Sequence, residues 1–184
     1  MNRSDLLLHL QARLQIEDAY KRHPEIEQER IHKPLVIIGQ GRSGTSALQN
    51  LLSQDPNNGT TLHWECLFPY PPPERATYRT DSRIARAEPL ISQLYRVVPE
   101  MISMHEFGAQ LPIETIFLDA LSFRSPDWFG FSNGQVPSYN AYVAVQDEAA
   151  ILRVLRNRIE RSGIPGTAAL HERTPALGAP DPSL

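Results

Sequence analysis

A short glycine-containing segment has the residue types and spacing that could do chemistry. It reads GQGRSGTS from Gly39 to Ser46, so that a second glycine, Gly44, precedes a pair of hydroxyl side chains. In such a turn successive backbone amides and the N-terminus of a following helix face one concavity, which suits a tetrahedral anion. Loops that bind nucleoside triphosphates carry a lysine after the second glycine. Here Thr45 takes that place and Arg42 is the only cation of the loop.

Two features argue against nucleoside triphosphate hydrolysis at this loop. The lysine that reaches the terminal phosphates is absent, and no other apolar strand in the sequence ends in an evident magnesium-binding aspartate. Arg42 supplies a fixed charge and a fork of hydrogen-bond donors, and Ser43 adds a hydroxyl. A different anion is indicated, and a βα turn without a ligand remains the alternative.

The elements around the loop predict an α/β fold. Residues 35–38 read LVII, an apolar run rich in β-branched residues that predicts a strand buried on both faces. After the loop, apolar residues follow helical spacing until Asp55-Pro56: Ala47, Leu48, Leu51 and Leu52. A strand, a glycine loop and a helix form the first half of a βαβ unit, which predicts a mainly parallel sheet.

The remaining pattern predicts mostly helices. An amphipathic helix over residues 4–20, capped by Ser4, should bury Leu7, Leu10, Leu14 and Ile16. Residues 61–68 alternate between apolar and polar and favour an extended segment, which the following prolines end. Further helices are expected in four places: residues 25–31, residues 81–98 with Asp81 near the start, residues 113–123, and residues 139–161.

Composition narrows the class of protein. The chain has 184 residues, 41% of them apolar, which is enough for one domain. A net charge of −3 argues against nucleic-acid binding through a basic face. The single cysteine, Cys66, excludes an internal disulfide and fits a reducing compartment. No apolar run is long enough to span a bilayer, so we expect a cytoplasmic protein.

At this point the residues carry a resemblance. The segment PLVIIGQGRSGTSALQNLL resembles the 5′-phosphosulfate-binding loop of sulfotransferases, in the branch whose loop reads Pro-Arg-Ser-Gly-Thr-Thr. The segments HWECLFPYPPPE, YRTDSRIARAE, MHEFGAQLPIE and VPSYNAY are similar to a bacterial, largely actinobacterial, set of the same family. The likeness covers residues 34–156. It implies a P-loop-containing three-layer fold with a parallel sheet.

The resemblance implies a donor and a set of donor-binding residues. The donor is 3′-phosphoadenosine 5′-phosphosulfate (PAPS), the product is a sulfate ester, and no metal is expected. Arg42 would lie beside the 5′-phosphosulfate as both a donor-binding and a catalytic group. The other donor-binding residues would be Gly39, Gly41, Ser43, Gly44, Thr45 and Ser46. Gly41 departs from the family's usual proline, and Ser46 replaces a common threonine while keeping the hydroxyl.

Sulfonyl transfer to an alcohol also needs a group that removes the proton of the acceptor. Related sulfotransferases often place a glutamate for this beyond the loop, and Glu65 stands at a matching distance. His63, two residues away, is the rival, and His105 is the third candidate. The acceptor would be a small-molecule or lipid-like hydroxyl compound, with no nucleic-acid partner and no membrane span. Trp128, Phe129 and Phe131 could line its site, and the sequence does not set the oligomeric state.

The resemblance fades toward the C-terminus. Residues 1–32 form an N-terminal helical segment, residues 33–161 the N-terminal part of a sulfotransferase domain, and residues 162–184 an expected disordered tail rich in Gly, Pro and Ala. The family's later strand, and the arginine and serine that bind the donor's 3′-phosphate, are not found. We therefore expect a truncated chain with an incomplete sheet, or one that a partner chain completes. Two other functions stay open: a non-catalytic fragment or anion-binding module, and a P-loop phosphotransferase.

Overall fold

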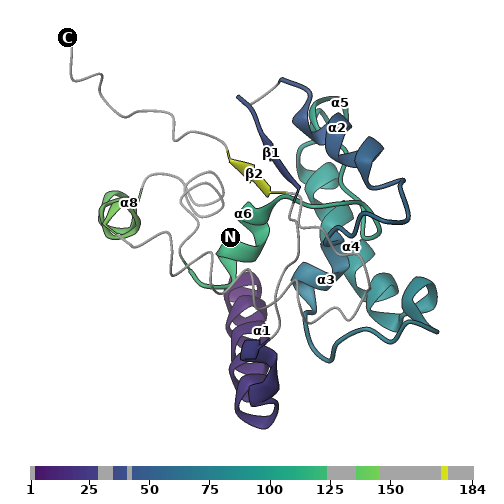
Figure 1. Cartoon of the computed structure of the whole chain (residues 1–184). Coiled ribbons are helices and arrows are strands. Elements are labelled where there is room, and N and C mark those ends of the chain that lie inside the picture. Colours follow the sequence, from purple (N-terminus) through teal and green to yellow (C-terminus); the bar gives the residue numbers. More distant parts are fainter. Residues whose placement is uncertain (1–2, 29–34, 41–42, 124–135, 146–170, 174–184) are drawn as a thin grey trace.

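The structure is a computed structural model that describes residues 3–28, 35–40, 43–123, 136–145 and 171–173 (Figure 1). The elements in chain order are α1 (Arg3–Arg22), η1 (Pro24–Gln28), β1 (Val36–Ile38), α2 (Thr45–Leu52), α3 (His63–Leu67), η2 (Tyr78–Thr80), α4 (Ser82–Val97), α5 (Met101–Met104), α6 (Thr115–Ala120), α8 (Pro137–Ala144) and β2 (His171–Arg173). Among the described helices none is long and apolar enough to cross a bilayer.

The described sheet is a pair of parallel strands. β1 pairs with β2 so that Val36 lies opposite His171 and Ile38 opposite Arg173, and Figure 1 shows the two strands side by side. β2 falls within residues 162–184, for which the sequence predicts a mostly disordered tail; the rest of that range lies outside the described residues, and the disordered tail stays a prediction there. At residues 171–173 the pairing with β1 satisfies backbone groups of the chain.

β1 is less covered than its apolar sequence predicts. Ile37 is buried at 7% exposure, whereas Ile38 on the opposite face is 70% exposed. The prediction of a strand buried on both faces is therefore wrong for the described structure, in which α2 contacts β1. The physical reason is that a run of β-branched residues reports strand propensity, whereas burial depends on what packs on each face.

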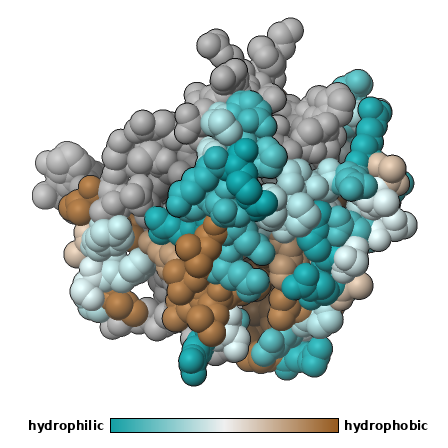
Figure 2. Space-filling view, turned by 90° about the horizontal axis from the view of Figure 1, so that it is seen from below, coloured by the Kyte–Doolittle hydropathy of each residue, from teal (hydrophilic) through white to brown (hydrophobic). Residues whose placement is uncertain are grey.

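Helix α1 forms where expected and buries Ile16 as predicted, but it does not bury the predicted leucines. The leucines chosen from the sequence, Leu7, Leu10 and Leu14, are exposed, and Ser4 lies inside the helix rather than capping it. The buried residues are His9, Ala12, Ile16 and Ala19. Helix α1 contacts α3. On the face seen from below, hydrophobic surface alternates with hydrophilic residues (Figure 2).

The segment expected to be extended is a short helix instead. α3 buries His63, Trp64 and Cys66, and the amides of His63 and Trp64 donate to the carbonyls of Leu111 and Ala109 at 3.1 and 3.0 Å. These hydrogen bonds attach the start of α3 to the chain that precedes α6. The alternating pattern could not distinguish an extended segment from a helix here, because the five residues of α3 make little more than one helical turn.

Helix α4 confirms its prediction and holds the main core. The side chain of Asp81 accepts a hydrogen bond from the amide of Arg83 and caps the helix. The fully buried Trp64 packs with Ala87, Ile91 and Ala109, so α3 and α4 share one cluster. Helix α6 is shorter than the predicted helix over residues 113–123, and η1 and α8 cover the described parts of the helices predicted over residues 25–31 and 139–161. Residues 29–31 and 146–161 lie outside the described residues.

The burial of α1 can be tested with two residues of the same helix. Ile16 is 4% exposed and Leu14 is 68% exposed. We predict that Ile16→Ala lowers the free energy of unfolding by about 2–4 kcal/mol, because it leaves a cavity in the packed face. Leu14→Ala should change it by less than about 0.5 kcal/mol. Urea unfolding of both variants measures the difference, and equal effects would contradict the observed orientation of α1.

Candidate functional site

The glycine loop joins β1 to α2 through a tight turn. The backbone amide and the hydroxyl of Ser43 both donate to the carbonyl of Gln40, at 3.2 and 2.6 Å. Gly39 has no room for a side chain, because a Cβ there would lie 2.6 Å from Cγ2 of Thr45 and 2.8 Å from Oγ of Ser43. Gly44 precedes α2 with φ = 90°, a left-handed conformation that glycine adopts without strain. Gly41 and Arg42 lie outside the described residues.

A cavity of about 350 Å³ opens beside this loop. Its described wall comes from the end of the loop, from α2, and from the chain around α5 and before α6: Gly44, Thr45, Ser46, Ala47, Gln49, Asn50, Met104, His105, Glu106, Pro112 and Glu114. Three of the predicted donor-binding residues, Gly44, Thr45 and Ser46, therefore share one cavity. Because they begin α2, its N-terminal amides and the positive end of its dipole lie at the same place.

Two hydrogen bonds fix the far wall of this cavity against α2. The buried side chain of Gln49 donates to the carbonyl of Ile113 at 3.3 Å. The hydroxyl of Ser46 donates to Oε1 of Glu114 at 3.5 Å. Glu114 is thus a site residue that the reading of the sequence missed. The signal was available, because Glu114 ends the segment MHEFGAQLPIE that resembles the family.

His105 also lines the cavity, and its segment is held by one tyrosine. The hydroxyl of Tyr95 on α4 contacts the carbonyls of His105 and Phe107 at 3.2 and 3.3 Å, and the amide of Phe107 donates to the same hydroxyl. The rings of His105 and Phe107 lie with centroids 4.3 Å apart. The structure therefore brings the third candidate base, and not the first two, into the described wall of the cavity.

Glu65 is buried in a hydrogen-bonded position on α3. Its Oε2 accepts from the amide of Leu62 at 2.8 Å and from the hydroxyl of Tyr78 at 3.1 Å. Burial raises the pKa of the Glu65 carboxyl from 4.5 to about 7, and the hydrogen bonds from Leu62 and Tyr78 partly oppose that rise. Such a carboxyl changes its charge near neutral pH, which is a property of many groups that transfer protons.

His63 lies at the start of the same helix in an apolar environment. Its ring lies 5.0 Å from the ring of Phe117 and 6.0 Å from that of Phe107, measured between centroids. Burial, together with a smaller effect of the charge of His105, lowers the pKa of His63 from 6.5 to about 4. The imidazole is therefore neutral at pH 7. Among the described atoms its Nδ1 has no hydrogen-bond partner, and these contacts favour a packing role.

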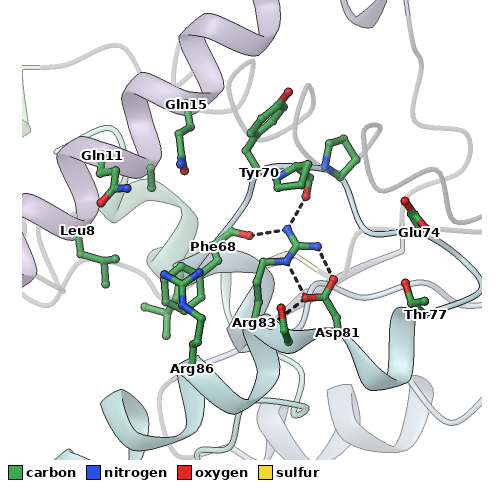
Figure 3. A pocket seen from close by; sticks show the side chains of 15 residues that line it. Leu8, Gln11, Gln15, Phe68, Tyr70, Glu74, Thr77, Asp81, Arg83 and Arg86 are labelled. Carbon is green, nitrogen blue, oxygen red and sulfur yellow. Dashed lines mark hydrogen bonds and ion pairs between the residues drawn. The ribbon is translucent and has the colours of Figure 1, made fainter.

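A second cavity, of about 530 Å³, lies between α1 and the start of α4 (Figure 3). Arg83 is at its centre: the guanidinium makes a bidentate ion pair with Asp81, at 2.9 and 2.6 Å, and donates to the carbonyls of Phe68 and Pro71. The same guanidinium lies 4.7 Å from the centre of the Trp64 ring. It therefore joins the end of α3, the proline-rich segment and α4, and we assign it a structural role.

A match to a family model shows which family this chain belongs to. A model of the sulfotransferase family matches residues 34–157, a span that includes the loop, α3, α4 and the far wall of the cavity. The chain belongs to the sulfotransferase family. No match was found among curated proteins.

Two solved structures show the same fold. Sulfotransferase STF9 from Mycobacterium avium is 24% identical with a TM-score of 0.70, and the match covers 90% of this chain and 43% of that one. Sulfotransferase STF1 from Mycobacterium tuberculosis is 24% identical with a TM-score of 0.71, covering 91% and 46%. This sulfotransferase-family chain thus has an α/β fold whose described part is mostly helical. It spans less than half the length of either solved chain.

Because the carboxyl of Glu65 is buried, we predict that the free energy of unfolding of the chain depends on pH. Because its pKa is higher in the folded chain than the ordinary 4.5, the folded state binds more protons between pH 4.5 and about 7. Stability should therefore fall as pH rises through this window, by on the order of 2 kcal/mol. We predict that Glu65→Gln, which keeps an oxygen acceptor for Leu62 and Tyr78, removes most of this fall.

Urea unfolding at pH 5 and pH 8 checks this expectation. Glu74→Gln is the matched control, because Glu74 is an exposed carboxylate. A fall in stability that is the same in the wild-type chain and in Glu65→Gln would contradict the assigned environment of Glu65.

Proposed function

We propose that this chain transfers a sulfonyl group from PAPS to a hydroxyl of a small-molecule or lipid-like acceptor. The observation that carries the proposal is the match to the sulfotransferase family over residues 34–157. This span includes a loop that turns tightly at Gly39 and Gly44 and leads into α2 beside a cavity. The two solved relatives support it, since both are called sulfotransferases. We further propose that β1 and β2 belong to the parallel sheet of a three-layer P-loop fold.

In this proposal the loop holds the 5′-phosphosulfate of the donor. The amides at the start of α2 and the hydroxyls of Ser43, Thr45 and Ser46 would donate to its oxygens, and the guanidinium of Arg42 would balance its charge. A sulfonyl group carries less negative charge than a terminal phosphoryl group. Amides and one arginine can therefore serve where phosphoryl transfer commonly uses a lysine and magnesium.

The reaction is an in-line displacement at sulfur. The acceptor oxygen forms a bond to sulfur while the bond from sulfur to the 5′-phosphate oxygen breaks, and the electron pair of that bond stays on the phosphate. The proton of the acceptor hydroxyl passes to a base. We propose Glu65 for this role, because a pKa of about 7 leaves a basic carboxylate in a large fraction of molecules at neutral pH.

His105 is the rival base, and its place in the cavity wall favours it. Glu65 would have to exchange its hydrogen bonds to Leu62 and Tyr78 for one to the acceptor, and such bonds often rearrange when substrate binds. Release of adenosine 3′,5′-bisphosphate from PAPS, with water or an alcohol as acceptor, distinguishes the two. Loss of turnover with unchanged donor binding in Glu65→Gln, but not in His105→Asn, supports Glu65, and the reverse result assigns His105.

We also propose that the protein acts in the cytoplasm. Cys66 is buried, and it is the only cysteine of the chain. A chain without internal disulfides is typical of reducing compartments.

Donor binding provides the test of the proposed function. Isothermal titration with adenosine 3′,5′-bisphosphate should show micromolar binding that Arg42→Ala weakens by roughly tenfold or more, because a charge-assisted bidentate contact is lost. Arg86→Ala is the matched control. Arg86 lies over the ring of Phe68, 4.4 Å from its centre, in the wall of the second cavity. The proposal would be contradicted if the wild-type chain, Arg42→Ala and Arg86→Ala bound adenosine 3′,5′-bisphosphate equally well. It would also be contradicted if the chain bound ATP in its place, and only with magnesium.

A further inference from the structure

Helix α1 carries apolar residues on two faces. One face is buried and consists of His9, Ala12, Ile16 and Ala19. The other holds three leucines that are largely exposed: Leu7 at 53%, Leu10 at 45% and Leu14 at 68%. At about 100° per residue, the centres of the two sets lie roughly opposite each other around the helix axis. The helix is therefore held by one face and presents a row of leucines on the other, at the lower edge of the view in Figure 1.

Charged residues extend this row of leucines at both ends. Arg3 precedes Leu7 by four positions, Glu17 follows Leu14 by three, and both charged residues are exposed. Steps of three and four residues keep side chains on one face of a helix, so the five positions form one leucine stripe that reads Arg-Leu-Leu-Leu-Glu along α1. The stripe is positive at its N-terminal end, apolar in its middle and negative at its C-terminal end.

We propose that the leucine stripe binds a second copy of this chain, with the two α1 helices antiparallel. A two-fold interface uses the same patch on both subunits, so the patch must be complementary to itself. When the pair is centred on Leu10, Leu7 of each copy faces Leu14 of the other, and Arg3 of each copy faces Glu17 of the other. Opposite charges therefore meet at both ends, whereas a parallel pair would place like charges together.

The charges of the stripe also favour a protein partner over a lipid surface. Helices that bind anionic lipids carry Lys and Arg on the polar face, whereas this stripe ends in one charge of each sign. Lys21, four positions after Glu17, lies past the first described residue of the second copy in the proposed register. The contact uses one side of a 20-residue helix. Small interfaces are typical of transient association, so we expect a dissociation constant on the order of 10–100 μM.

Sedimentation equilibrium of the full chain over roughly 5–300 μM, which brackets this constant, should show monomer and dimer. Glu17→Arg should raise the dissociation constant by roughly fivefold or more, because it places arginine opposite arginine at both ends of the pair. Arg3→Glu should do the same. The double variant Arg3→Glu/Glu17→Arg restores opposite charges and should return the constant to within about twofold of the wild-type value. Glu74→Arg, a charge reversal at another exposed glutamate, is the matched control and should change nothing.

Cysteine variants test the antiparallel register separately. Leu10 faces its own copy, so Leu10→Cys should form a disulfide-linked dimer when copper and air oxidise the two thiols. Leu7→Cys should link to Leu14→Cys when the two variants are mixed, and neither should link efficiently to itself. A parallel pair predicts the reverse. The wild-type chain, whose single cysteine, Cys66, is buried, is the control.

Three results would overturn the inference. The first is a wild-type chain that stays monomeric over the whole range, whether or not it binds vesicles of phosphatidylglycerol. The second is a dimer that Leu10→Lys leaves intact, which would place the interface elsewhere. The third is failure of the double charge variant to restore association while its circular dichroism matches that of the wild-type chain.

Two measurements keep these results independent of folding. Every substituted position of the stripe is exposed, so we expect the variants to fold, and circular dichroism checks each one. If a charge variant fails to fold, the pattern of cysteine links decides the register alone. At a protein concentration of about 1 μM the chain is mostly monomeric, so urea unfolding of Leu14→Ala there still reports the packing of α1 within one chain.

Discussion

The close approach of Gly39, Ser43 and Thr45 in the glycine loop is the constraint on which the candidate site depends. The side chains of Thr45 and Ser43 occupy the space that a Cβ at Gly39 would need. A larger residue at Gly39 would force the side chain of Ser43 or Thr45 to move, and both belong to the turn that leads into α2. Gly44, with its left-handed backbone, then lets the chain enter α2 directly.

A second group of interactions joins α3, the proline-rich segment and α4. The buried guanidinium of Arg83 would destabilise the fold if it lacked partners, and it is satisfied by Asp81 and by the carbonyls of Phe68 and Pro71. It also packs on Trp64 in the main core. The guanidinium of Arg83 therefore holds the chain that follows α3 against the start of α4. Tyr95, further along α4, in turn holds the backbone at His105, so the core and the cavity wall are parts of one framework.

The sequence predicted best where a local pattern has one physical meaning. A β-branched run, a glycine turn and helical spacing specify β1, the loop and α2, and Asp81 marks the start of α4 because its carboxylate can accept from the first free amides. The buried face of α1 could not be predicted the same way. Its leucines suggested one face, but the residues that the surrounding chain buries are His9, Ala12, Ile16 and Ala19.

Contacts between distant residues were the least predictable part of the site. Glu114 reaches Ser46 across 68 positions, and no local pattern encodes that distance. The environment of Glu65 depends likewise on Tyr78, which comes from the chain before α4. Residue types therefore predicted the position of the glycine loop, which we propose binds an anion, whereas the wall that faces it emerged only from the packing of α2 against the chain before α6.

Amide hydrogen exchange of the loop tests most directly whether it is an assembled anion site. The amides of residues 43–46 should exchange more slowly when adenosine 3′,5′-bisphosphate is added, because they become donors to its 5′-phosphate, while amides in the exposed part of α1 should not change. That result would establish the turn at Gly39 and Gly44 as the donor-binding element. Unchanged exchange in residues 43–46 at saturating ligand would contradict the account.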